Sequence, residues 1–442
     1  MTRIVLVGAG SVEFTRNLLG DILSSPALRD ADLVLHDIDP DRLKTAERMA
    51  LWTSSALGAS PSITTHLDRR DALRGADFVI NTIQVGGARA TRVDFEVAGR
   101  YGLRYTIADT IGVGGVFRGL RTVPVALGIA RDMEAVCPDA WLLNYTNPLA
   151  ILVRAVSEAS GIKVIGLCHS VFWTIDAIAG YLGVPRDEID YESAGVNHLA
   201  FLLKLRHRVR DLYPDLRRFV DAGRTPDDNL VRSELFLRLG FYPTESSEHH
   251  AEYNTWFIGK RDDRGDPVER FHVPIGEYLD RVSHNLDEYA DTVRKLDAGE
   301  PFEIERSGEY AATIAEAMAT GAPARIVGNV MNRGALIPNL DADACVEVPC
   351  LTDGLGVRPV AVGPLPIQLA AYVRSAVDMQ GLTVQAALRH DRDAIGHAVM
   401  TDPIVQSHLT LDQAWKLTDA MIEAESEWLP LTPARITPGA TP

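Results

Sequence analysis

A cysteine and a distant histidine could form a metal site in this 442-residue chain. Cys168 and His169 follow the apolar run VIGL, and His198 lies 30 residues beyond Cys168, after another short segment. One thiolate and one imidazole from separate loops can hold a divalent cation and leave coordination positions for a substrate. The sulfur ligand by itself favours zinc or iron. The alternative is a cysteine that is simply buried and a histidine that only forms hydrogen bonds.

A second candidate site lies near the start of the chain, where Gly8-Ala9-Gly10-Ser11 follows the apolar run RIVLV. Glycines at this point let the backbone turn tightly and direct its free amides at a pyrophosphate. The usual third glycine is absent, and Glu13 stands near its place. Asp37 ends the second apolar run, 27 positions after Gly10, where a carboxylate accepts both ribose hydroxyls and repels a 2′-phosphate. The pattern favours NAD over NADP, although Asp37 could also be a solvated residue of an acidic turn.

The elements that must position these residues alternate over the first 200 positions. The strand-like runs are RIVLVG, DLVLHD, ADFVINT, AWLLNY and KVIGLC, and longer amphipathic stretches separate them. Strands separated by helices need crossover connections, which predicts an α/β fold with a doubly wound, parallel, Rossmann-type sheet. Longer helical segments and the strand-like run CVEVPCL follow, and they predict a second, mixed α+β lobe.

We therefore expect an NAD-binding domain over residues 1–195. A lobe for catalysis, substrate binding and oligomerisation is expected over residues 196–442. The tail PLTPARITPGATP is rich in proline and small residues, so it is expected to be loose.

Composition excludes several kinds of partner. The chain has 60 Asp and Glu against 44 Lys and Arg, and its formal charge of -16 repels nucleic acids over most of the surface. We find no secretory leader and no run of about 18 apolar residues, so no membrane association is expected. Four cysteines are too few for a disulfide scaffold and fit a reducing compartment. These features predict a cytoplasmic protein with a small-molecule substrate.

Several long segments closely resemble glycoside hydrolase family 4, in the same order and from the first strand to near residue 430. They are VGGARATRVDFEVAGRYGLRYTIADTIGVGGVFRGLRTVP, NYTNP, GLCHSV, GVNHLAF and TESSEHHAEYNTWF. The tetrapeptide that begins at the metal cysteine varies with substrate in this family, and Cys168-His169-Ser170-Val171 resembles that of bacterial α-galactosidases. Phe172 and Trp173 depart from that pattern, in which a smaller polar pair stands. The departure leaves the exact glycone and leaving group open.

The resemblance implies a role for each candidate residue. Cys168 and His198 would bind a divalent metal, usually manganese, in place of the zinc or iron that sulfur suggests. Tyr253 would be the general base, with His169 and Asp109 as further catalytic groups. The residues implied to bind NAD are Gly8, Gly10, Ser11, Asp37 and Asn144. Those implied to contact the sugar are Asn147, His169 and Arg118. Since family members usually form dimers or tetramers, a homodimer or homotetramer is expected.

The reaction that this resemblance implies is hydrolysis of an α-galactoside by NAD-mediated transient oxidation at C3 of the sugar. The C2 proton then becomes acidic, the leaving group is eliminated and water adds back. Glu245, Glu248 and Glu252 suggest instead an ordinary pair of acid and base carboxylates, but such a pair does not explain a dinucleotide site.

Other activities remain open at this stage. An α-glucuronidase, α-galacturonidase or α-glucosidase would use the same machinery, and for a uronide Arg89, Arg92 or Arg118 could bind the C6 carboxylate. An NAD-dependent 2-hydroxy-acid dehydrogenase is a further alternative, because lactate and malate enzymes share this sheet and an Asn-Pro turn resembling Asn147-Pro148. Such a dehydrogenase needs neither the metal pair nor the large second lobe. A non-catalytic NAD sensor would leave Cys168 and His198 without a shared role.

Overall fold

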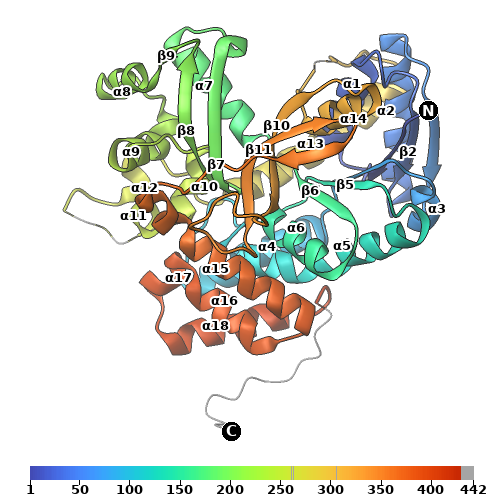
Figure 1. The fold of residues 1–442 in the computed structure, drawn as a ribbon. Helices are drawn as coiled ribbons and strands as arrows, with labels where there is room; N and C mark the ends of the chain where they lie inside the picture. The colour runs from blue at the N-terminus through green and yellow to red at the C-terminus, as the bar shows by residue number, and fades with distance from the viewer. Residues whose placement is uncertain (260, 262, 305, 430–442) are drawn as a thin grey trace.

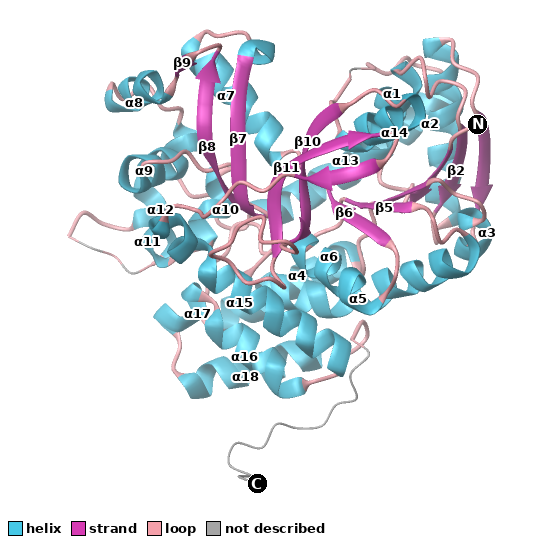
Figure 2. Cartoon of the chain, viewed as in Figure 1, coloured by secondary structure: helices cyan, strands magenta, loops and turns pink. Residues whose placement is uncertain are grey.

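The computed structural model describes residues 1–259, 261, 263–304 and 306–429. Within this part of the chain a 12-stranded sheet runs through the whole molecule, with helices packed along both of its sides (Figures 1 and 2). Its order is β3-β2-β1-β4-β5-β6-β10-β11-β7-β8-β9, with β12 paired to β11. The proline-rich tail that was expected to be loose lies outside the described residues.

The amino-terminal half of the sheet is parallel and doubly wound. Its strands are β1 (Arg3–Val7), β2 (Asp32–His36), β3 (Ser62–His66), β4 (Phe78–Asn81), β5 (Trp141–Asn144) and β6 (Lys163–Gly166). The strand-like runs seen in the sequence form five of these strands, so the predicted fold class is confirmed. β3 was missed because its sequence, SITTH, is polar, as suits a half-exposed strand at the edge of the sheet.

The helices between these strands make the crossovers that a parallel sheet requires. They are α1 (Val12–Ser24), α2 (Pro40–Leu57), α3 (Arg69–Leu73), α4 (Gly87–Arg100), α5 (Gly112–Val136), α6 (Leu149–Ala159) and α7 (Ser170–Leu182). By length and composition α5 could cross a membrane, but 78% of its apolar window is buried inside the molecule. Its apolar surface is therefore accounted for by packing against neighbouring helices such as α6 and α15 (Ile367–Arg389).

The carboxyl-terminal half continues the same sheet with antiparallel strands. They are β7 (Ile189–Val196), β8 (Leu199–His207), β9 (Arg210–Asp211), β10 (Ala324–Met331), β11 (Cys345–Asp353) and β12 (Gly356–Pro359). β10 joins the halves, because its Asn329 pairs with Gly166 of β6 on one side and with Glu347 of β11 on the other. The run CVEVPCL forms most of β11, as predicted. Because the sheet is continuous here, the domain boundary at residue 195 stays a prediction.

The remaining helices surround this second half. They are α8 (Tyr213–Asp221), α9 (Leu230–Leu239), α10 (Ser247–Glu252), α11 (Thr255–Ile258), α12 (Pro267–Arg270), α13 (Glu277–Ala298), α14 (Tyr310–Thr320), α15, α16 (Arg392–Thr401), α17 (Pro403–His408) and α18 (Leu411–Ala424), with 3-10 turns at Arg186–Glu188 and Asp227–Asn229. Although α13 comes from the second half, it packs on α1, α2 and α4 of the first. α15, α16 and α18 form a helical layer below the sheet in the view of Figure 1.

Arg121 on α5 is a fully buried cation that joins α5, α4 and the end of α18. Its guanidinium bonds Asp94 on α4 at 2.7 and 3.0 Å, and Glu425 just after α18 at 2.8 and 3.0 Å. All three side chains are at most 2% exposed. Since none of them reaches water, the loss of one partner leaves a buried charge without compensation. The network therefore fixes the carboxyl-terminal helices to the core.

Replacing Arg121 by Met should destabilise the protein by about 3–5 kcal/mol, because Asp94 and Glu425 then face each other without a cation. The matched control is Arg89→Met, which breaks an exposed ion pair with Glu427 that also links α4 to the carboxyl-terminal segment. Exposed pairs contribute only about 0–1 kcal/mol. Urea unfolding midpoints measure both effects, and equal midpoints for the two variants would contradict the role given to the buried network.

Candidate active site

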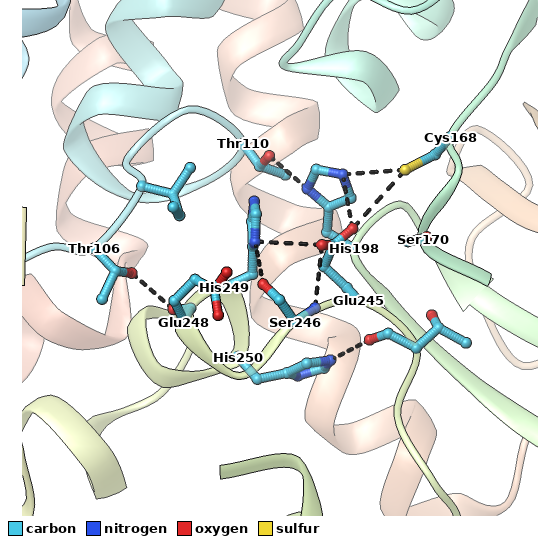
Figure 3. A network of polar contacts seen from close by, with 12 residues as sticks. Thr106, Thr110, Cys168, Ser170, His198, Glu245, Ser246, Glu248, His249 and His250 are labelled. Carbon is cyan, nitrogen blue, oxygen red and sulfur yellow. Dashed lines mark hydrogen bonds and ion pairs between the residues drawn. The ribbon is translucent and has the colours of Figure 1, made fainter. Parts of the chain in front are cut away.

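The candidate site lies where the segment after β6 meets the turn between β7 and β8 (Figure 3). Cys168 follows β6, and His198 stands in a two-residue turn between Val196 and Leu199. The φ angle of His198 is +62°, a conformation that non-glycine residues adopt only where the surroundings impose it. The segment that leads into α10 supplies Glu245 to the same point.

Three possible ligand atoms converge here, as the predicted metal pair requires. Nε2 of His198 lies 3.3 Å from Sγ of Cys168 and 3.3 Å from Oε2 of Glu245. The same Oε2 lies 3.9 Å from Sγ of Cys168. The structure therefore brings the two predicted metal residues together and adds Glu245, which the sequence suggested only as a member of a carboxylate pair. A hard carboxylate beside a thiolate and an imidazole makes manganese a better fit than the sulfur ligand alone implies.

The protonation states of these groups suit metal binding. Burial lowers the pKa of His198 to about 4, so the ring is neutral and can ligate at neutral pH. Burial would raise the pKa of Glu245, but His198 and His249 outweigh it and lower that pKa well below its usual range. Burial, with Glu245 and Glu347, raises the pKa of the Cys168 thiol. A cation must therefore displace a proton from sulfur in order to bind.

The other ring nitrogen of His198 faces two hydroxyl groups. Nδ1 lies 2.8 Å from Oγ1 of Thr110 and 3.4 Å from the phenolic oxygen of Tyr253. A second possible ligand set, formed by Asp109, His198 and His249, also uses this ring. Because Thr110 occupies Nδ1, the free Nε2 favours the set with Cys168 and Glu245.

Asp109 is a buried carboxylate beside this ring. Oδ1 accepts from Thr110 at 2.7 Å, and Oδ2 accepts from Nδ2 of Asn147 at 2.9 Å. Burial would raise its pKa, but Arg118 and nearby histidines outweigh that effect and lower it. Arg118 on α5 donates to the carbonyl of Asn147 at 3.1 Å and to the hydroxyl of Tyr278 at 3.1 Å. The predicted sugar-binding residues Asn147 and Arg118 are thus joined to Asp109 in one network.

His169 and Asn144 occupy different surroundings. The half-exposed ring of His169 places Nδ1 3.3 Å from Oε1 of Glu309, a buried residue at the start of α14. Burial alone would lower the pKa of His169, but Glu309 outweighs it and raises that pKa. Asn144 is fully buried, accepts from Asn81 at 2.8 Å and donates to the carbonyl of Thr146 at 2.9 Å. Its side chain holds neighbouring strand ends together, whereas that of His169 faces outward.

Tyr253 is buried, and its phenol is neutral in this structure. Burial raises its pKa well above the usual value, and Glu252, Asp109 and Glu245 add to the rise. Tyr242, another buried tyrosine, instead accepts from Nδ2 of Asn229 at 2.6 Å. The structure thus distinguishes the two, because only Tyr253 of this pair contacts the metal-ligand candidate His198.

The remaining carboxylates of the TESSEHHAEY segment have structural roles. Glu252 is buried and accepts from the backbone amides of Thr106, Ile107 and Ala108 at 2.9–3.1 Å. It therefore fixes the segment that presents Asp109, and burial raises its pKa to about 7. Glu248 pairs with Arg281 of α13 at 2.5 Å. The ordinary acid and base pair that these glutamates suggested is not assembled around the ring of His198.

The loop between β1 and α1 fits a dinucleotide. Gly8 has φ +89°, and a Cβ there would lie 2.9 Å from the carbonyl carbon of Thr82. A Cβ at Gly10 would lie 2.7 Å from Oδ2 of Asp37. Asp37 accepts from the amide of Gly10 at 2.8 Å, and Ser11 precedes the first turn of α1. The predicted residues therefore meet at one sheet edge, where a side chain larger than hydrogen at Gly8 or Gly10 would collide with Thr82 or Asp37.

Some residues of the site were not found from the sequence. Glu309 contacts His169 across 140 residues, and Tyr278 contacts Arg118 across 160 residues. No local sequence pattern could predict contacts of this range. His249 lies inside the quoted TESSEHH run, and its position four residues after Glu245 was the available signal.

Two family models match the chain. The family 4 glycosyl hydrolase model matches residues 3–184, and the family 4 glycosyl hydrolase C-terminal domain matches residues 193–405. Among curated proteins, an alpha-galactosidase of Bacillus subtilis (strain 168) is 41% identical over 432 residues, which cover 97% of this chain and 99% of that protein. An alpha-galactosidase of Rhizobium meliloti (strain 1021) is 35% identical, with 97% and 89% of the two chains covered.

Solved structures show the same fold. A 6-phospho-alpha-glucosidase from gut microorganisms, in complex with NAD and glucose-6-phosphate, superposes with TM-score 0.83 at 21% identity over 97% of this chain and 99% of that one. The 6-phospho-beta glucosidase of Thermotoga maritima with manganese, NAD+ and glucose-6-phosphate gives 0.80 at 20% identity, covering 98% and 100%. Malate dehydrogenase of Plasmodium falciparum gives only 0.51 at 14% identity, covering 89% and 100%.

Replacing Glu245 by Gln should weaken the binding of manganese by about 10–100-fold, because one charged ligand is lost. The matched control is Glu248→Gln, three residues along, whose carboxylate pairs with Arg281 instead. Affinity in the unmutated protein should rise with pH across the neutral range, since the raised pKa of the Cys168 thiol makes protons compete for sulfur, while His198 is already neutral. Calorimetric titration with manganese measures both effects. Equal manganese affinities for the two variants would exclude Glu245 as a ligand.

Proposed function

Because the chain belongs to family 4 of the glycosyl hydrolases, we propose that it hydrolyses α-galactosides with NAD and a divalent cation, manganese, as cofactors. The observation that carries the proposal is the convergence of Cys168, His198 and Glu245 at the sheet edge that also holds the glycine loop. The two α-galactosidases that match nearly the whole chain support the choice of sugar. The tetrapeptide Cys168-His169-Ser170-Val171 supports it as well.

The residues present fit both cofactors. Cys168, His198 and Glu245 would hold the cation, while Gly8, Gly10, Ser11 and Asp37 would hold NAD, with Asn144 supporting the strand ends beside it. When bound, NAD would supply a reversible hydride acceptor for C3 of the sugar, and the cation would supply a Lewis acid for the sugar oxygens, which together would make the C2 proton acidic.

We assign the C2 proton to the phenolic oxygen of Tyr253. Its raised pKa keeps the phenol protonated as long as no cation lies nearby. However, the phenol lies 3.4 Å from Nδ1 of His198, whose Nε2 faces the other metal-ligand candidates, so metal loading lowers the pKa of Tyr253. The base therefore becomes active only in the loaded enzyme.

His169 is placed to donate a proton to the leaving oxygen. Glu309 raises its pKa and holds Nδ1, so the ring is well suited to carry a proton near neutral pH. Asp109 and Asn147 bind sugar hydroxyls in the proposed complex, because a carboxylate and an amide offer acceptors and donors together. Arg118 orients the backbone of Asn147 beside them.

A uronide substrate has less support in this structure. Of the three arginines that could bind a C6 carboxylate, Arg89 is exposed and pairs with Glu427, and Arg92 is exposed. Arg118 alone among these three lies in the site, where Tyr278 and Asn147 already engage it. A neutral galactose fits this arrangement better. Glucose, the sugar that an α-glucosidase releases, differs from galactose only in the orientation of one hydroxyl.

We further propose that the protein is a cytoplasmic homodimer or homotetramer, with the NAD-binding domain at residues 1–195 and the catalytic lobe at 196–442. The four cysteines are all free in the described chain, which is compatible with a reducing compartment. The negative charge makes nucleic acid an unfavourable partner.

A panel of nitrophenyl α-glycosides tests the proposed function in the presence of manganese, NAD and a thiol reductant. The α-galactoside should be cleaved faster than the α-glucoside and the two uronides. Chelation or oxidation should abolish cleavage, because Cys168 must ligate as a thiolate, and manganese with reductant should restore it. Full activity after removal of NAD and metal would contradict the proposal, and a faster reaction with a uronide would correct the substrate.

Tyr253→Phe should lower kcat by about 100-fold or more while NAD and manganese still bind, because the ring packs but the phenolic oxygen is gone. The matched control is Tyr242→Phe, which removes a buried hydroxyl that contacts Asn229 instead. Hydrolysis by the unmutated enzyme in heavy water should leave deuterium at C2 of the released sugar, as nuclear magnetic resonance would show. A product with C2 wholly protonated would contradict proton removal by an exchangeable base.

A further inference from the structure

An exposed tryptophan stands beside the sugar-binding residues without a role in the chemistry above. Trp173 lies in the first turn of α7, and 64% of it is exposed. Its ring centroid is 5.5 Å from that of His169, with 41° between the ring planes. The indole therefore offers an exposed aromatic face next to a proposed sugar-binding residue.

Phe172, the other residue of the unusual pair, has a different environment. The guanidinium of Arg186 lies 3.5 Å from the centre of its ring. A Cβ on Gly308, which has φ +76°, would lie 2.8 Å from the edge of the same ring. Gly308 directly precedes Glu309, which contacts His169. Phe172 is therefore fixed by packing against the turn that supports His169, whereas Trp173 keeps a free face.

The rings of Phe14, His169 and Trp173 form a continuous aromatic wall. Phe14 on α1 lies 6.4 Å from His169 with 24° between the ring planes, and Trp173 lies 5.5 Å from the same imidazole. Phe14 and His169 are partly buried, whereas Trp173 is exposed. Trp173 is therefore the solvent-exposed ring of the three and lies next to His169.

We propose that Trp173 forms the subsite for the leaving group and binds a sugar ring there by stacking. The inference rests on the proposed function, which places the reacting carbons near Cys168 and the leaving oxygen near His169.

The indole of Trp173 suits a sugar ring chemically. Its flat face matches the apolar C–H face of a pyranose, while the hydroxyl groups of the sugar remain in water.

Substrates with different leaving groups test this subsite with the holoenzyme. They are methyl α-galactoside, a disaccharide of α-galactose linked to glucose, and a trisaccharide that extends it. In Trp173→Ala, KM for the disaccharide and trisaccharide should rise about tenfold, while KM for the methyl glycoside stays within about twofold. Trp173→Phe should restore most of the loss, because a smaller aromatic face remains. Free glucose should also inhibit Trp173→Ala less strongly than the unmutated enzyme, because it would occupy the same subsite.

The matched control is Trp256→Ala, which removes another exposed tryptophan, 57% exposed, whose ring stacks on Tyr372. Its KM values should not discriminate between leaving groups. An equal rise in KM for all three substrates in Trp173→Ala would overturn the inference. Unchanged KM values would overturn it as well, and a smaller assembly of this variant in sedimentation would then assign Trp173 to a contact between subunits. If the unmutated enzyme cleaves none of the α-galactosides, including the methyl glycoside, the proposed function itself fails and the subsite with it.

Discussion

The imidazole of His198 is the single group on which the rest of the site depends. Its Nε2 faces Cys168 and Glu245, and its Nδ1 faces Thr110 and Tyr253. A neutral ring carries one proton, so if Nδ1 donates to a hydroxyl oxygen, Nε2 must present its lone pair to the other side. Burial keeps the ring neutral by lowering its pKa to about 4. The tautomer of His198 that is protonated at Nδ1 therefore links Cys168 and Glu245 on one side of the ring to Tyr253, the proposed base, on the other.

That ring can be held only because distant segments are fixed around it. The β7–β8 turn sets its backbone, and Glu252 holds the amides of residues 106–108, which bring Thr110 to Nδ1. Glu245 lies just before α10 and Glu252 is the last residue of α10, so one short segment positions a metal-ligand candidate and the support of the opposite loop. Loss of either contact would act on the metal and the base together, which is why their contributions should not be additive.

The sequence predicts the parts of the site that depend on local patterns, but not the contacts between residues that lie far apart in the chain. The parallel strands and the glycine loop are local patterns, and residues at the carboxyl ends of such strands must gather at one edge, so Cys168 and Asp37 were found. Glu245 meets Cys168 across 77 residues and Glu309 meets His169 across 140. Those approaches depend on antiparallel strands β7, β8 and β10, whose sequences gave no clear alternation. The resemblance supplied Tyr253, and the structure adds its contact with His198.

α13 shows how the two halves of the reaction are connected. Its Tyr278 bonds Arg118, its Arg281 pairs with Glu248, and its Tyr289 packs under Arg42, which donates to the carbonyl of Gly10. Thr292 is the one buried residue among those described in this helix, so polar contacts rather than apolar burial hold it in place. Such contacts are weak in water, and an element held by them costs little to displace. The same helix touches the nucleotide loop and the sugar site, so ordering of either end favours the arrangement that both require.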